Sequence, residues 1–151
     1  MMLTLGKKIV VAIDGSPQSD KAAEEAVRLA SVSGDRFRSV VYAVFVLPPQ
    51  ESLVIDYLPD AAANPRRCGL RETKRRIFSV VEKVAGEVGV ELEQMTVVGD
   101  PAEEILRVAE EKVADVIVIG SSGKGRLRRV LHGSTSAKVL QHSRCSVYLV
   151  R

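Results

Sequence analysis

Residues 7–30 have the sequence KKIVVAIDGSPQSDKAAEEAVRLA, which predicts a strand followed directly by a helix. Residues 7–14 form a short β-branched apolar run bounded by charges, typical of a strand buried on both faces of a sheet. Ser16 is a good N-cap for the helix, Pro17 suits its first position, and Gly34 ends it. The helix face expected to pack on the sheet holds Ala22, Ala26, Leu29, Ala30 and Ser33.

The same alternation of strand and helix continues along the chain. Further strands are predicted at residues 39–47, 92–98, 116–120 and 146–150. Helices are predicted from about residue 66 to residue 88, from residue 101, and over residues 134–142, with residues 48–65 as a long proline-containing loop. Strands joined through helices require parallel pairing with helices on both faces. We therefore expect one doubly wound α/β domain over residues 1–151.

Two of the later helices have a clear apolar face. The face of the first is Leu70, Ile77, Val81, Val84 and Val88, and Gly89 ends this helix. In the second, Asp100 and Glu103 have the spacing of a capping box. The face of the second is Ala102, Ile105, Leu106, Ala109 and Val113. Each face has the three- and four-residue spacing of a helix that covers a sheet.

Composition excludes several classes of protein. The chain is 46% hydrophobic and 27% charged, and no apolar run approaches the roughly 20 residues that a membrane-spanning helix needs. Its two cysteines, Cys68 and Cys145, lie in no metal-ligand spacing, so a reducing cytoplasm fits. The net charge of +3 is too small to indicate a nucleic-acid partner by itself.

The glycine-rich segment VIGSSGKGRLRRVLHGSTS at residues 118–136 is the most informative for function. It leaves a buried strand and enters a helix at Ser134. Glycines let backbone amides approach an anion, and the helix N-terminus offers free N–H groups and the positive end of its dipole. The segment matches neither a Walker A nor a dinucleotide motif. Spacing alone leaves two interpretations open: a phosphate site, or a turn and a helix cap.

Gly120, Gly123, Gly133 and Ser134 together match the pattern G-x2-G-x9-G-[ST], which resembles the ATP-binding signature of universal stress proteins. Residues 7–30 resemble the opening strand and helix of that family. The segments STSAKVLQH and CSVYLVR resemble its last helix and strand. The resemblance covers nearly the whole chain and is weakest over residues 48–65.

The resemblance implies a five-stranded parallel sheet in the order 3-2-1-4-5, like that of adenine nucleotide α-hydrolases. It implies that ATP, or ADP or AMP, binds with Mg²⁺ or Mn²⁺, and that Asp14 approaches the ribose or the phosphate-bound ion. Ala12, Ile13 and Val46 would border the adenine. The ribose and phosphates would be held by Gly120, Ser122, Gly123, Gly133, Ser134, Thr135 and Ser136. If the first and fourth strands are neighbours, Asp14 and Gly120 meet in the crevice where such sheets bind ligands.

The function that the resemblance implies is a nucleotide-responsive regulatory module with little or no hydrolysis, acting as a homodimer. The last strand, residues 146–150, offers a sheet edge that a second copy can satisfy. An interaction module with an empty glycine loop is the alternative. An adenylating enzyme of related fold would need a further substrate domain, for which 151 residues leave no room.

Other polar residues are assigned no functional role. His132 has no evident partner for base catalysis, and His142 suits the C-terminal end of its helix. Two basic groups are interpreted mainly as solvated surfaces, with the alternative that cations of the first group pair with phosphates, for which Lys124 and Arg129 are the better candidates by proximity. The first is Lys124, Arg126, Arg128 and Arg129, and the second is Arg66, Arg67, Arg71, Lys74, Arg75 and Arg76. Nucleic acid is not expected as a partner, because the chain lacks the interleaved aromatic rings of single-strand binders.

Overall fold

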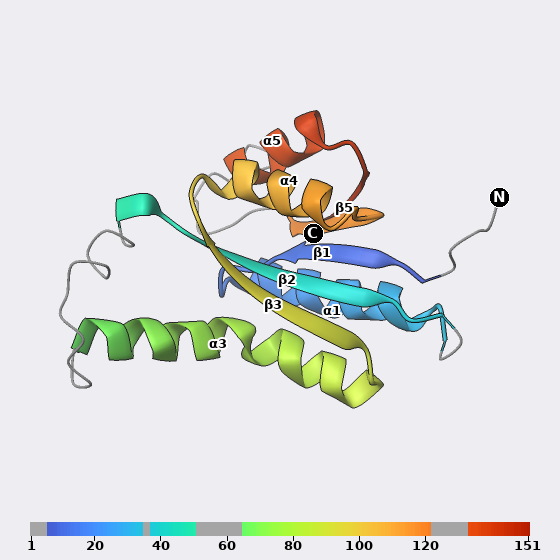
Figure 1. The fold of residues 1–151 in the computed structure, drawn as a ribbon, viewed down its shortest axis with the longest axis horizontal. Coiled ribbons are helices and arrows are strands. Elements are labelled where there is room, and N and C mark those ends of the chain that lie inside the picture. The colour runs from blue at the N-terminus through green and yellow to red at the C-terminus, as the bar shows by residue number, and fades with distance from the viewer. Residues whose placement is uncertain (1–5, 35–36, 51–64, 122–132) are drawn as a thin grey trace.

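The computed structural model describes residues 6–34, 37–50, 65–121 and 133–151. Its strands and helices alternate along the chain (Figure 1). The strands are β1 (Lys8–Ala12), β2 (Val40–Leu47), β3 (Glu91–Val98), β4 (Val116–Gly120) and β5 (Ser146–Val150). The helices are α1 (Pro17–Ser31), α3 (Pro65–Val88), α4 (Pro101–Glu111) and α5 (Ser134–His142).

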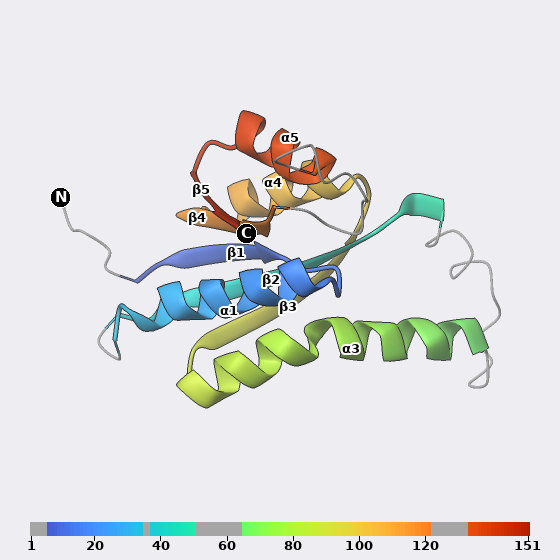
Figure 2. The ribbon, with the colours of Figure 1, turned by 180° about the vertical axis from the view of Figure 1, so that it is seen from behind.

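All five strands form one parallel sheet in the order β3-β2-β1-β4-β5, as the sequence predicts. The order reverses at β1, which pairs with β2 on one side and with β4 on the other. Helices α1 and α3 cover one face of the sheet and α4 and α5 cover the other (Figures 1 and 2). The fold is thus a single doubly wound α/β domain.

The central strand β1 is buried from both sides. Ile9, Val10 and Val11 have no exposed surface, because their side chains alternate between the two helical layers. Ile9 and Val11 pack among α1 and α3, whereas Val10 packs with Ile117 beneath α4. Burying each such side chain stabilises the fold by about 1.5–3 kcal/mol. This explains why the strand is an apolar run with no polar alternation.

Helix α1 begins as the sequence predicts. Ser16 is its N-cap, and the Ser16 hydroxyl accepts a hydrogen bond from the Ser19 N–H. On the predicted face Ala22, Ala26 and Ala30 are buried, but Leu29 and Ser33 are only partly buried. Buried positions that the face omitted are Ser19, Ala23 and Val27. The buried stripe is therefore wider than predicted, since α1 lies over β1 and also contacts β4 and β2.

Two predicted core residues at helix ends prove wrong. Val88, in the last turn of α3, is 52% exposed, and Val113, just after α4, is 72% exposed. Helical spacing reaches both positions, but neither side chain is covered by another element. Val113 also has a positive φ of 53°, so it has left the helix. In α4 the Asp100 carboxylate caps the Glu103 N–H at 3.2 Å.

The predicted loop at residues 48–65 is described only at its ends. Pro49 and Gln50 have helical backbone, separated by one residue from the end of β2, and residues 51–64 lie outside the described residues. The remaining boundaries agree with the predicted ones to within a few residues. Among the described residues, none of the helices is long and apolar enough to cross a membrane.

Candidate functional site

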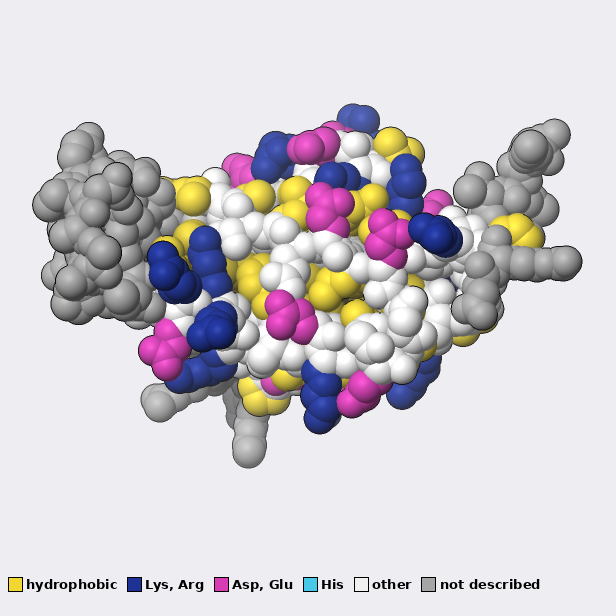
Figure 3. All heavy atoms as spheres, turned by 60° about the horizontal axis from the view of Figure 1, so that its bottom comes forward, with side chains coloured by type: hydrophobic (Ala, Val, Ile, Leu, Met, Phe, Trp, Pro, Cys, Tyr) yellow, Lys and Arg dark blue, Asp and Glu magenta, His cyan; other side chains and the backbone are white. Residues whose placement is uncertain are grey.

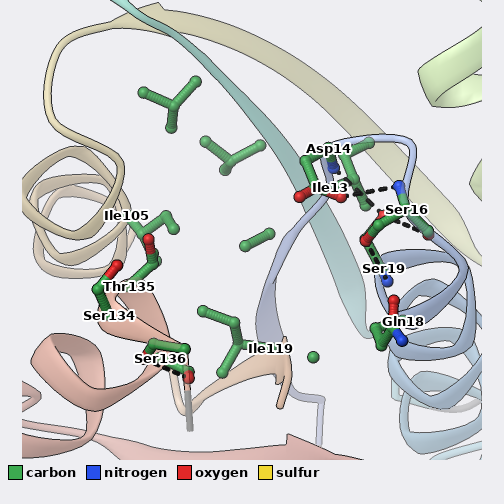
Figure 4. Close-up of a pocket in the computed structure, with 15 residues that line it drawn as sticks. Ile13, Asp14, Ser16, Gln18, Ser19, Ile105, Ile119, Ser134, Thr135 and Ser136 are labelled. Atoms are coloured by element: carbon green, nitrogen blue, oxygen red, sulfur yellow. Dashed lines mark hydrogen bonds between the residues drawn. The ribbon is translucent and has the colours of Figure 1, made fainter. Parts of the chain in front are cut away.

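A cavity of about 350 Å³ opens at the carboxyl ends of the strands, where the strand order reverses. Three strands contribute to its walls: the carboxyl ends of β1 and β4 and the carboxyl-terminal half of β2. The remaining walls are α4 and the first turns of α1 and α5. Figure 4 shows the two polar sides facing each other across the apolar part. In open α/β sheets this is the position at which ligands bind.

Most of the residues proposed from the sequence lie around this one cavity. Nine of them line it: Ala12, Ile13, Asp14, Val46, Gly120, Gly133, Ser134, Thr135 and Ser136. The two others, Ser122 and Gly123, lie outside the described residues. Residues separated by more than 100 positions in the chain thus meet because β1 and β4 are neighbours.

The sequence interpretation missed six lining residues, namely Ser16, Gln18, Ser19, Val44, Ile105 and Ile119. Val44 could have been predicted from the sequence, because it lies two residues before Val46 and so points to the same face of β2. Ser16 was identified only as the N-cap of the helix, and Ser19 was not singled out. Ile105 comes from α4, whose distance from β1 no local pattern reveals.

The apolar part of the cavity lies on the α4 side of the sheet. Ala12, Val44, Val46 and Ile119 present side chains from three adjacent strands, and Ile105 reaches over them from α4. Ile119 and Ile105 are almost fully buried. The surface suits a flat apolar ring system better than a charged group, because it offers no polar side chain.

The polar side formed by the start of α1 is already hydrogen-bonded. The Asp14 Oδ1 atom accepts from the Ser16 N–H at 2.8 Å, and the Ser19 hydroxyl accepts from the Asp14 N–H at 3.2 Å. The Ser19 hydroxyl also donates to the Ser16 carbonyl at 3.0 Å. These bonds hold the turn between β1 and α1, where Gly15 has a φ of 80°.

Asp14 and Asp20 place negative charge on this side. Partial burial raises the pKa of the Asp20 carboxyl, and repulsion from Asp14 and Glu24 raises it further. The α1 side therefore repels an anion at close range unless a hydrogen-bond donor or a cation lies between the anion and these carboxylates. Among the described residues there is no group of three His, Cys, Asp or Glu that could hold a metal ion by itself.

The opposite polar side is the start of α5. Gly133 is its N-cap and makes no side-chain capping hydrogen bond. The Gly133 N–H donates to the Ser121 carbonyl at 2.8 Å, and the Ser136 hydroxyl donates to the Gly133 carbonyl at 2.9 Å. Ser134 and Thr135 line the cavity, so the positive end of the helix dipole faces it.

Gly120 has a packing reason to be glycine. A Cβ atom at Gly120 would lie 2.9 Å from the Cβ atom of Gln18 and 3.1 Å from its carbonyl. The end of β4 thus presses against the first turn of α1. This contact fixes the width of the cavity between β4 and α1, independently of any ligand.

The basic cluster on α3 is a surface feature. Arg71, Arg75 and Arg76 are exposed, and Glu72 is exposed among them. In Figure 3 a group of Lys and Arg side chains lies toward the end at which α3 begins, and side chains of both charges are scattered over the rest of that face. The side chains of Arg66 and Arg67, and the glycine-loop cations Lys124, Arg126, Arg128 and Arg129, lie outside what the structure describes.

Comparison with known proteins agrees with the fold and identifies the family. The model of the universal stress protein family matches residues 6–151. The chain belongs to the universal stress protein family. The chain is 36% identical over 145 residues to universal stress protein YxiE of Bacillus subtilis. The alignment covers 95% of this chain and 98% of the relative.

Solved structures give the same family. Protein MJ0577 of Methanocaldococcus jannaschii superposes with a TM-score of 0.74 at 25% identity, over 97% of this chain and 96% of the other. A universal stress protein crystallised in complex with cAMP has a TM-score of 0.63 at 26% identity, over 97% of each chain. The fold of this universal stress protein is therefore that of its solved relatives.

Proposed function

We propose that this universal stress protein binds an adenine nucleotide, ATP with Mg²⁺ or Mn²⁺, in the cavity between β1 and β4 and acts as a nucleotide-responsive regulatory module. The observation that carries the proposal is the pairing of an apolar wall with an open helix N-terminus in one cavity of about 350 Å³. Small-molecule sites have volumes of about 300–1,000 Å³ and this kind of mixed lining.

The base would occupy the apolar part. Ala12, Val44 and Val46 provide a surface on the sheet, and Ile105 covers it from α4. The Ile13 N–H donates to the Val44 carbonyl at 2.9 Å, which keeps the two strand ends together beneath the base. Asp14 then lies at the boundary between the apolar and polar parts, in position for a ribose hydroxyl.

The phosphates would lie at the start of α5. Ser134, Thr135 and Ser136 contribute hydroxyls and backbone N–H groups there, and the helix dipole favours an anion. Gly120 and Gly133 allow close approach of the backbone. The sequence motif adds Ser122 and Gly123 to the same group.

A metal ion fits this site only together with the nucleotide. Mg²⁺ is usually bound through one or two carboxylates and the phosphates of its substrate. Asp14 is the only ionisable side chain among the described residues that line the cavity. It is the candidate ligand, and the ion would offset its charge near the phosphates.

The solved relative in complex with cAMP supports an adenine nucleotide as the class of ligand. The first experiment is to denature freshly purified protein and identify released nucleotide by mass spectrometry, then to titrate stripped protein with ATP and Mg²⁺ by calorimetry. Micromolar binding of ATP would support the proposal. No released nucleotide and no heat, with an unchanged melting temperature, would contradict it and favour the interaction module.

A matched pair of variants tests the phosphate position. Ser134→Asp adds a negative charge at the first position of α5, where an acidic residue stabilises the helix and preserves the fold. We expect it to weaken ATP binding at least tenfold while adenosine binding changes little. Ala137→Asp adds the same charge to an exposed position of α5 that does not line the cavity, and should bind ATP as the parent does.

The regulatory form is proposed to be a homodimer formed through β5. β5 is an edge strand of the sheet, and Tyr148 on it is 41% exposed. Charged side chains on an edge strand oppose pairing with another strand. Tyr148→Lys should therefore shift sedimentation from dimer to monomer, and a parent protein that sediments as a monomer would contradict the proposal.

Hydrolysis of the nucleotide is expected to be slow at most. The cytoplasmic location and the lack of a nucleic-acid partner stay predictions.

A further inference from the structure

The hydroxyls and the carboxylate at the start of α1 are mostly used by the protein itself. The Ser16 hydroxyl accepts from the Ser19 N–H, and the Ser19 hydroxyl both donates to the Ser16 carbonyl and accepts from the Asp14 N–H. The Asp14 carboxylate accepts from the Ser16 N–H. A ligand that reaches this side therefore finds few free donors.

Gln18 is an exception on this side, as is the Ser16 O–H, which donates to no group among the described residues. Gln18 lines the cavity and is partly buried, yet within the described residues its carboxamide makes no hydrogen bond. A carboxamide carries two N–H donors and an acceptor. Figure 4 shows Gln18 beside Ser19, across the cavity from Ser134, Thr135 and Ser136.

The backbone fixes Gln18 next to the glycine-rich segment. The position of a Cβ atom at Gly120 is 2.9 Å from the Cβ atom of Gln18, so the Gln18 side chain starts at the point where β4 ends. In the proposed pose the phosphates lie between this point and the start of α5. The Gln18 carboxamide is thus nearer to the phosphates than to the base.

Gln18 is a neutral side chain among acidic groups, and this matters for the approach of a phosphate. Asp14 and Asp20 stand on the same side, and the raised pKa of the Asp20 carboxyl is due to burial first and then to Asp14 and Glu24. A carboxylate at position 18 would add to this negative field. A carboxamide adds no charge and offers donors that phosphate oxygens accept.

From these observations we infer that Gln18 is a specificity-determining residue that donates a hydrogen bond to the phosphate chain of the nucleotide. The inference rests on the proposed function and adds to it the means by which the α1 side tolerates a polyanion. Through this bond Gln18 would make the site prefer a phosphorylated nucleotide over a bare nucleoside.

The test compares ATP and adenosine by calorimetry on stripped protein in the presence of Mg²⁺. Gln18→Glu should weaken ATP binding at least tenfold and change adenosine binding less than about twofold. Gln18→Met keeps the length of the side chain and removes the donors, so it should weaken ATP binding at least tenfold, the usual effect of losing one hydrogen bond to a charged acceptor. Melting temperatures should stay near that of the parent, because an acidic residue suits the second position of a helix.

Pro17→Glu is the matched control, since Pro17 is exposed, adjacent in sequence and absent from the lining of the cavity. It should leave the affinity for ATP unchanged. Equal weakening of ATP and adenosine by Gln18→Glu, or unchanged affinity for ATP in both Gln18 variants, would overturn the inference while leaving nucleotide binding intact. A parent protein that binds neither ligand would instead overturn the proposed function.

Discussion

Gly120 at the end of β4 lies directly against Gln18 in the first turn of α1, with room for no side chain between them. This contact joins the end of β4 to the polar side of the cavity formed by the start of α1. It means that Gly120 has a structural role whether or not a nucleotide is bound, in addition to the role that the glycine motif implies.

Gly120→Ala should therefore destabilise the fold. The new Cβ atom would lie 2.9 Å from the Cβ atom of Gln18, and the helix must shift to relieve the contact. Overpacking of this kind costs about 1–3 kcal/mol. Urea unfolding at equilibrium measures the change. Gly86→Ala is the control, because it lies within α3 with nothing near its Cβ position and should be stabilising.

Val113→Gly should stabilise the protein. Val113 has a φ of 53° and is 72% exposed, so a branched side chain is held in the left-handed region with little burial in return. Relief of that strain outweighs the chain entropy of glycine, and we expect a gain of about 0.5–1 kcal/mol in thermal unfolding.

Val32→Gly provides the matched comparison for Val113→Gly. Val32 is 77% exposed and follows α1 as Val113 follows α4, but its φ is −61°, in the right-handed region. Glycine there relieves no strain and should lower the melting temperature. If both substitutions shift the melting temperature equally, backbone strain at Val113 is not the cause.

Ser16→Ala should destabilise α1 by about 1 kcal/mol. It removes the oxygen that accepts from the Ser19 N–H and leaves that N–H buried beside the cavity. Chemical unfolding followed by circular dichroism gives the free energy. Ser31→Ala removes an exposed hydroxyl at the other end of the helix and should change the free energy of unfolding by less than about 0.5 kcal/mol.

Asp14→Asn should lower the pKa of the Asp20 carboxyl, because it removes the second of the causes that raise it. A raised pKa in the folded state means that stability is full below the unfolded pKa of Asp20 and is lost as pH rises through the folded pKa. The variant should lose less stability over that interval. NMR titration of the Asp20 carboxyl measures the shift, and Asp115→Asn, at the other end of the sheet beside Lys8, should leave it unchanged.

Much of the fold followed from local pattern. The run from Ile9 to Val11 predicted a strand buried on both faces, and Ser16 and Asp100 correctly marked the starts of α1 and α4. The errors lie at helix ends: Val88 and Val113 continue the apolar spacing but are exposed. Periodicity reports which side of a helix an apolar residue occupies and contains no information on where the opposing surface stops.

The candidate site was predictable where a residue belonged to a motif or to the end of a strand. Gly120, Gly133 and Ser134 belong to the glycine signature, and Asp14 follows β1. Val44 shares a strand face with Val46, so the two-residue period of a strand predicts it from Val46. Ile105 and Gln18 belong to no motif, and only the packing of α4 and α1 around the end of β4 brings them to the cavity.

The sequence by itself determined the class of the fold, because apolar runs without alternation can be buried only in a parallel sheet between helical layers. It also determined the glycine-rich segment and its place between a strand and a helix. The tertiary structure decided which side chains share the cavity, which donors the start of α1 leaves free, and that Gly120 is a packing residue. Those properties depend on distances between segments far apart in the chain, and such distances are set by packing and not by local pattern.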